Sequence, residues 1–127
     1  MGRGQSVSAT RAIGIGFSSD ASVEDVLALL RAVAGTPERG TCLATLDRRA
    51  AIAREVAVVL GLQLLTFPAE VLVQVKAIVT PSPRAAERVG TPSVAEAAAL
   101  LAAGPGARIV IPRRTGTRCT CALAESP

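Results

Sequence analysis

Residues 90–104, GTPSVAEAAALLAAG, carry the clearest structural signal in this chain of 127 residues. Both ends of the stretch are typical of the ends of an α-helix. Ser93 followed three residues later by Glu96 is a capping box, in which the hydroxyl accepts from the Glu96 amide and the carboxylate accepts from the Ser93 amide. Gly104 supplies the left-handed residue that commonly ends a helix. The stretch therefore predicts a helix from Ser93 to Gly104.

The interior of this helix contains almost nothing but alanine and leucine, with no charged face for solvent. Such a helix is expected to be buried and close-packed, and its small side chains allow a neighbouring backbone to approach closely. A shorter helix is predicted just before it, because Ser82 can cap a helix whose first residue is Pro83, and Gly90 can end it. Two helices are thus expected to meet at residues 90–92.

The chain before residue 70 alternates strand and helix patterns. The expected elements are a strand at Ala12–Gly16, a helix capped by Ser22, a strand at Thr41–Leu46, a helix capped by Asp47 and ended by Gly61, and a strand at Leu62–Phe67. The expected buried positions of the first helix are Val23, Val26, Leu27, Leu30 and Val33, and those of the second are Ile52, Val56, Val59 and Leu60. This repetition indicates a parallel sheet.

The chain after residue 67 holds a brief helical turn from Pro68 through Val75 and, after the buried helix, two more strands. The fourth strand is Ala107–Pro112, and we expect Pro112 to end it. Residues 113–117 read as a turn that contains a glycine, and residues 118–124 alternate with period two. We therefore expect the last strand to form an antiparallel hairpin with the fourth and to lie at the edge of the sheet.

These elements predict an α/β fold: a three-layer sandwich with a mainly parallel sheet of about five strands, the last of them antiparallel in a C-terminal hairpin. Residues 11–124 are expected to form a single domain, and residues 1–10, rich in glycine, serine and threonine, a disordered tail. Ligands of such sheets bind at the carboxyl ends of the strands.

Composition narrows the class of partner. Half of the residues are hydrophobic, but no apolar run approaches the roughly 18 residues of a membrane span, so we expect no membrane partner. Of the 14 basic residues all but Lys76 are arginines, and the net charge of +4 favours acidic ligands. The chain has two aromatic residues and neither tryptophan nor tyrosine, so it lacks the stacking platforms of single-strand binders and we expect no nucleic-acid partner.

Cysteine and histidine usage bears on location and on metals. The three cysteines are too few for a disulfide framework, and with no secretory leader recognised we expect a cytoplasmic protein. No histidine is present, which removes the usual general base and the commonest metal ligand. Cys119 and Cys121 share one face of a strand, but with only Cys42 as a third ligand a zinc site is incomplete, so no metal is expected.

Two motifs have both a structural and a functional interpretation. Residues 14–16, Gly-Ile-Gly, are a fragment of a dinucleotide fingerprint, but a tight turn from strand to helix explains them better, and no cofactor is expected. Asp47 is the weak candidate for a catalytic carboxylate, although the first residue after a strand is more often a helix cap. The predicted strand ends and the cap of the buried helix give these candidate ligand-binding residues: Gly16, Ser18, Thr45, Asp47, Arg49, Ser93, Arg113 and Arg114.

The order of these motifs resembles the CobE/CbiG carboxy-terminal domain family of cobalamin biosynthesis, over residues 11–124. The matching parts are Gly-Ile-Gly at 14–16, Ala-Thr-Leu-Asp at 44–47 with Arg49, residues 89–99, and the basic hairpin of residues 111–124. The resemblance implies the stand-alone CobE form. In CbiG the whole protein opens a lactone in a cobalt-precorrin and releases acetaldehyde, whereas the stand-alone form has no settled reaction, so the resemblance implies a pathway.

Three functions remain open on this basis. The first is an accessory or carrier module that binds a corrin-ring intermediate, a precorrin or hydrogenobyrinate-type compound, with arginines that grip its peripheral carboxylates bidentately. The second is a hydrolase or isomerase acting on a precorrin, similar to the cobalt-precorrin-5A hydrolase, with Asp47 or a serine at the same edge of the sheet. The third is a docking domain for another enzyme of the cobalamin pathway. Without a histidine or a paired carboxylate in any motif, the second lacks an obvious base.

Overall fold

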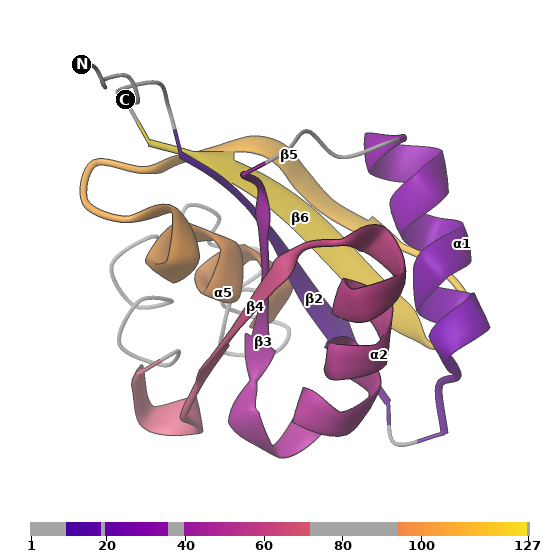
Figure 1. The fold of residues 1–127 in the computed structure, drawn as a ribbon. Helices are drawn as coiled ribbons and strands as arrows, with labels where there is room; N and C mark the ends of the chain where they lie inside the picture. The colour runs from indigo at the N-terminus through magenta and orange to yellow at the C-terminus, as the bar shows by residue number, and fades with distance from the viewer. Residues whose placement is uncertain (1–9, 19, 36–39, 72–93, 127) are drawn as a thin grey trace, which may run out of the picture.

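The computed structural model describes residues 10–18, 20–35, 40–71 and 94–126. Their elements are, in chain order, β2 (Arg11–Phe17), α1 (Val23–Ala34), β3 (Cys42–Leu46), the 3₁₀ turn η1 (Asp47–Arg49), α2 (Ala50–Leu60), β4 (Gln63–Phe67), α5 (Val94–Ala103), β5 (Arg108–Thr115) and β6 (Cys119–Glu125). Figure 1 shows the five strands as one twisted sheet with helices on both sides.

The sheet has the strand order β4-β3-β2-β6-β5. Strand β2 pairs in parallel with β3, and β3 in parallel with β4, while β6 is antiparallel to both β2 and β5. Only β6 therefore runs against the other strands, which confirms the expected α/β class. The prediction that the last strand lies at the edge is wrong: β6 lies between β2 and β5. Burial gives the reason, because β6 is mostly buried on both faces whereas β5 is mostly exposed.

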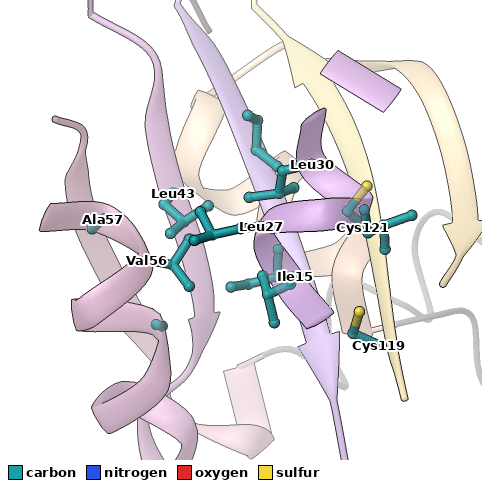
Figure 2. Close-up of a cluster of buried hydrophobic side chains, with 12 residues drawn as sticks. Ile15, Leu27, Leu30, Leu43, Val56, Ala57, Cys119 and Cys121 are labelled. Atoms are coloured by element: carbon teal, nitrogen blue, oxygen red, sulfur yellow. The ribbon is translucent and has the colours of Figure 1, made fainter. Parts of the chain in front are cut away.

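The two faces of the sheet are covered by different kinds of packing. Helices α1 and α2 cover one face, where large aliphatic side chains such as Ile15, Leu30, Leu43 and Val56 form the main core (Figure 2). Helix α5 covers the other face, where alanines of the helix meet small residues of the strands. The three-layer arrangement was expected, and so was the burial of the alanine-rich helix: all five buried residues of α5 are alanines.

Strand β2 produces this difference by alternating large and small residues. Ile13 and Ile15 face the main core, and Ala12 faces α5. A side chain on Gly14 would collide with the carbonyl oxygen of Ala95 and come within 2.7 Å of the Ala99 amide nitrogen. Glycine at position 14 therefore lets the backbones of α5 and β2 touch. The expectation that the Gly-Ile-Gly motif forms a strand-to-helix turn is wrong, because it lies within the strand.

Several helix ends form as the sequence predicts. Ser22 and Asp25 make a reciprocal capping box at the start of α1. Gly61 adopts the left-handed conformation at the end of α2, with φ of 71°. Gly104 follows α5 with φ of 100° and donates its N–H to the carbonyl of Leu100. The sequence signals for stopping a helix are thus confirmed.

The second helix differs from its prediction at its start and at one position of its buried face. Asp47 opens the 3₁₀ turn rather than capping α2, whose N-cap is Arg49 without a side-chain capping bond. Val59 was expected to be buried, but its side chain is 56% exposed. Val56 is buried as predicted, Ile52 and Leu60 are partly buried against the same core, and Ala53 and Ala57 are the other buried residues of the helix.

Strand β5 continues through Pro112 to Thr115, so the prediction that Pro112 ends the strand is wrong. Proline is tolerated there because β5 is the outermost strand in the described sheet, and its pairing with β6 shifts register on both sides of Ile111. Three predictions fall on residues that the structure does not describe. They are the helix at residues 82–90, the capping role of Ser93, and the disordered tail at residues 1–10 apart from Thr10.

Candidate functional site

A surface pocket of about 450 Å³ opens at the carboxyl end of β2. It lies where β2, the first residue of α5, the end of β5 and the start of β6 meet. The residues that line it are Gly16, Phe17, Ser18, Val94, Arg113, Thr115, Gly116, Arg118, Cys119 and Thr120. This is the end of a parallel strand at which α/β sheets of this kind bind ligands.

Antiparallel pairing of β6 with β2 builds the back wall of the pocket. Gly16 is the partner of Thr120 in the register, and the Thr120 hydroxyl donates to the Gly16 carbonyl at 3.4 Å. Beyond the strands, the Ser18 amide donates to the Arg118 carbonyl at 3.0 Å. The loop after β2 and the turn between β5 and β6 are therefore joined through their backbones.

The turn between β5 and β6 is held against helix α1. The Gly116 amide donates to the Cys119 carbonyl at 2.8 Å, which closes the turn. A side chain at Gly116 would lie 3.1 Å from the Cβ atom of Leu29, so the turn rests on α1. The thiol of Cys119 donates to the Asp25 carbonyl at 3.5 Å. The turn between β5 and β6, which forms one side of the pocket, is therefore held in place by α1.

Two arginines stand at the pocket, and their surroundings differ. The Nε atom of Arg118 lies 3.3 Å from Asp20 Oδ2, and its Nη1 atom lies 3.8 Å from Asp25 Oδ2. The exposed Arg113 forms, through its backbone N–H, a 3.2 Å hydrogen bond to Glu96 Oε2. Its guanidinium makes no hydrogen bond or ion pair with the part of the chain that the structure describes. Arg113 is therefore the cation available to an incoming anion.

The carboxylate of Asp20 is held in its ionised form. A hydrogen bond from the Ser18 hydroxyl is the largest cause that lowers the pKa of Asp20, and the Arg118 charge lowers it further. Asp20 is exposed to solvent on the loop that leads into α1. Its negative charge beside Arg118 is therefore present throughout the neutral range.

Three of the residues proposed from the sequence come together in this pocket: Gly16, Ser18 and Arg113. Arg114 is the neighbour of Arg113 along β5 but pairs in the register with Cys121, whose side chain belongs to the core on the α1 face. The two arginines were expected in one turn. Because they lie on a strand, their side chains project to opposite faces of the sheet.

The candidates at the end of β3 do not line the pocket. Thr45 is completely buried, and its hydroxyl donates to the Ile15 carbonyl at 2.8 Å, so it ties β3 to β2. Asp47 is exposed and Arg49 is half-buried, both in the 3₁₀ turn that follows β3. Ser93 lies outside the described residues, although Val94, the next residue, lines the pocket.

Sequence reasoning missed Arg118, Thr115 and Thr120. They became part of the pocket because β6 inserts next to β2, which brings the start of one strand to the end of the other. The period-two pattern of residues 118–124 was a usable signal for Thr120, since it places that residue on the face opposite Cys119 and Cys121. The position of β6 in the sheet carried no such signal.

The cysteines are free thiols inside the protein. Burial, and to a smaller extent the neighbouring Cys119, raises the pKa of the Cys121 thiol to about 11. Burial also raises the pKa of Cys42 and of Cys119. Among the described residues no three cysteine or acidic side chains gather in a way that could hold a metal ion. A buried protonated thiol is a small hydrophobic group, and these three serve as core residues.

The structure is a three-layer α/β domain with a surface pocket of about 450 Å³ at the carboxyl end of β2. The family model described as "Cobalamin synthesis G C-terminus" matches residues 11–124. The chain belongs to this family of cobalamin synthesis proteins. No match was found among curated proteins. Within the part of the chain that the structure describes, no helix has the length and apolar character to cross a membrane.

Two solved structures support the assignment. The chain is 30% identical to CobE, a protein from the cobalamin (vitamin B12) biosynthetic pathway, with a TM-score of 0.71 over 94% of this chain and 92% of that one. It is 35% identical to the cobalamin biosynthesis protein chiG from Agrobacterium tumefaciens str. C58, with a TM-score of 0.67 over 91% of this chain and 98% of that one. The agreement covers nearly the whole of each chain.

Proposed function

We propose that the protein binds a corrin-ring intermediate of cobalamin biosynthesis, a precorrin or hydrogenobyrinate-type compound, as an accessory or carrier module. The observation that carries this proposal is the pocket at the end of β2 with the exposed guanidinium of Arg113 at its side. Corrin intermediates carry peripheral acetate and propionate groups. A planar guanidinium grips such carboxylates through two parallel hydrogen bonds.

The lining of the pocket suits an amphiphilic ring. Phe17 and Val94 are partly buried and give apolar surface, while the hydroxyls of Ser18, Thr115 and Thr120 are hydrogen-bonding groups. Pockets with mostly apolar walls and a few convergent polar groups are typical of small-molecule sites, and about 450 Å³ lies within their usual size. A large ring would lie across the open mouth with one edge and its carboxylates inserted.

An absorbance titration tests the proposal, because a corrin has a visible spectrum that responds to its surroundings. Hydrogenobyrinic acid is titrated with the protein and with Arg113→Ala, and we expect the substitution to weaken binding about tenfold, which corresponds to about 1.4 kcal/mol. Arg113→Lys should restore only part of the affinity, since a point charge does not reproduce the planar fork.

Matched controls separate a defined site from general charge. Arg114→Ala removes the same charge from the next residue of β5 but on the other face of the sheet, and Arg31→Ala removes it from the exposed last turn of α1. Both should bind almost as the unaltered protein does. Equal losses from Arg31→Ala and Arg113→Ala would mean that net charge attracts the ligand. Failure of the unaltered protein to bind any corrinoid would remove the proposal and leave docking to a pathway enzyme.

A further inference from the structure

Arg118 and its two acidic partners form a contact that the proposed binding of a corrinoid does not by itself explain. The Arg118 side chain is 52% exposed beside the pocket, and the side chain of Asp20, whose Oδ2 atom lies 3.3 Å from the Arg118 Nε atom, is 72% exposed. An exposed ion pair of this kind contributes little to stability, because water screens the charges and both side chains lose freedom. The pair is therefore easily opened by a competing anion.

The backbone at Arg118 is in an unfavourable conformation. Among the described residues other than glycine, Arg118 alone has a positive φ, of 59°. Residues with side chains avoid this region, and glycine or asparagine would adopt it more readily. Strained backbone of this kind concentrates at functional sites, where the direction of a side chain matters more than local stability. Here the strain accompanies a guanidinium at the mouth of a pocket.

The two acidic partners are held to different degrees. Asp25 is fixed in helix α1, since its Oδ2 atom also accepts the Ser22 N–H at 3.0 Å and its side chain is only 20% exposed. Asp20 lies on the loop before the helix and is held otherwise by the Ser18 hydroxyl. Asp20 can therefore move away from Arg118 without disturbing the capping box, whereas Asp25 cannot.

We propose, as an extension that rests on the proposed function, that Asp20 is a built-in competitor for the ligand: its carboxylate occupies Arg118 in the free protein, and a carboxylate of the ligand replaces it there. Arg113 then makes the first contact and Arg118 the second. The exchange favours ligands with several carboxylates, because such a ligand engages both arginines at once, whereas an anion with one carboxylate must displace Asp20 to gain a single contact.

A titration of five proteins with hydrogenobyrinic acid tests the exchange. They are the unaltered protein, Asp20→Asn, Glu24→Gln, Arg118→Gly and the double variant Asp20→Asn/Arg118→Gly. Asparagine keeps an oxygen for the Ser18 hydroxyl but cannot compete for the guanidinium, so Asp20→Asn should tighten binding about threefold or more. Glu24, exposed in the first turn of α1, provides the control that removes the same charge, and Glu24→Gln should leave the affinity unchanged.

The remaining variants show whether the tighter binding expected for Asp20→Asn depends on the side chain of Arg118. Glycine suits the positive φ at this position, so Arg118→Gly removes the side chain while keeping the turn. It should weaken binding about tenfold. In the double variant, Asp20→Asn should add nothing to Arg118→Gly. Dicyanocobinamide, whose peripheral carboxylates are replaced by amides, should show no gain from Asp20→Asn.

Several results would overturn the exchange while leaving the proposed function intact. These are weaker or unchanged binding by Asp20→Asn, an equal gain from Glu24→Gln, or an additive effect in the double variant. If hydrogenobyrinic acid does not bind at all, citrate serves as a second probe, followed by the NMR signal of the Arg118 Nε–H group. If citrate shifts this signal, and if half of the shift occurs at a lower citrate concentration in Asp20→Asn, the exchange stands and only the proposal of a corrinoid ligand is rejected. If citrate causes no shift, both the exchange and the corrinoid proposal are rejected.

Discussion

Gly14 is, among the glycines that the structure describes, the one at which a side chain would collide with α5. A methyl group there would meet the backbone of the helix at Ala95 and Ala99, and backbone cannot swing aside as a long side chain can. We expect Gly14→Ala to lower the free energy of unfolding by about 3 kcal/mol, at the upper end of the usual cost of overpacking. Urea unfolding followed by circular dichroism measures this directly.

Gly16 gives the matched control for that substitution. It lies two residues further along β2 and so on the same face, but a methyl group there would come no closer than 3.1 Å, to the Thr120 hydroxyl, which can rotate. Gly16→Ala should therefore cost less than about 1 kcal/mol, since restricting a flexible glycine offsets part of the crowding. Similar losses from both variants would show that β2 simply requires glycine and that α5 does not touch it.

Among the helices and strands, α5 is the one whose burial the sequence predicts most directly. Ala98 of α5 is completely buried against β3, in a cluster that includes Ala44 of β3 and Ala97. We expect Ala98→Leu to lower the free energy of unfolding by roughly 1–3 kcal/mol, because the added carbons have no space to fill. The midpoint of thermal unfolding should fall accordingly.

Ala102, on the same helix but only partly buried, is the control for a change of the same size. Ala102→Leu should change stability by less than half of the loss at Ala98. An unaltered melting temperature in Ala98→Leu would mean that the helix is more loosely packed than its burial indicates.

Across the whole molecule, the three buried thiols make stability sensitive to alkaline pH. In the unfolded chain a thiol ionises near pH 9, whereas the pKa of Cys121 in the folded protein is about 11. Between these values the unfolded chain releases a proton that the folded protein retains, so rising pH favours unfolding. Stability should be constant with respect to this group below about pH 8 and fall by up to about 1.4 kcal/mol per pH unit between pH 9 and 11.

The composition of the chain allows the contribution of the cysteines to be measured with little interference from other groups. The chain contains no tyrosine and a single lysine, so few other side chains ionise in that range. Urea midpoints measured from pH 7 to pH 10.5 should therefore decline mainly through the cysteines. Cys121→Ala will be less stable at every pH because of the cavity, but its decline should be shallower. An identical slope in that variant would assign the alkaline loss to other groups.

The sequence by itself determined the elements whose signals are local. Capping residues and stop glycines act within one turn of helix, so Ser22, Gly61 and Gly104 could be read directly, as could the burial of a helix made of alanine. It also determined the α/β class, because alternating strand and helix patterns admit few other arrangements. Of the candidate site, Gly16, Ser18 and Arg113 were predicted because strand ends gather at one edge of a sheet.

The tertiary structure alone decided which strand ends became neighbours. A pattern of alternating residues shows that a segment is a strand but does not show which strands will pair with it, since pairing depends on contacts between residues far apart in the chain. The insertion of β6 between β5 and β2 brought Arg118 and Thr120 to the pocket and left Asp47 and Arg49 beyond β2, at the end of β3. The same insertion made β5 an exposed strand through Pro112, and the pleat of that strand separated Arg113 from Arg114.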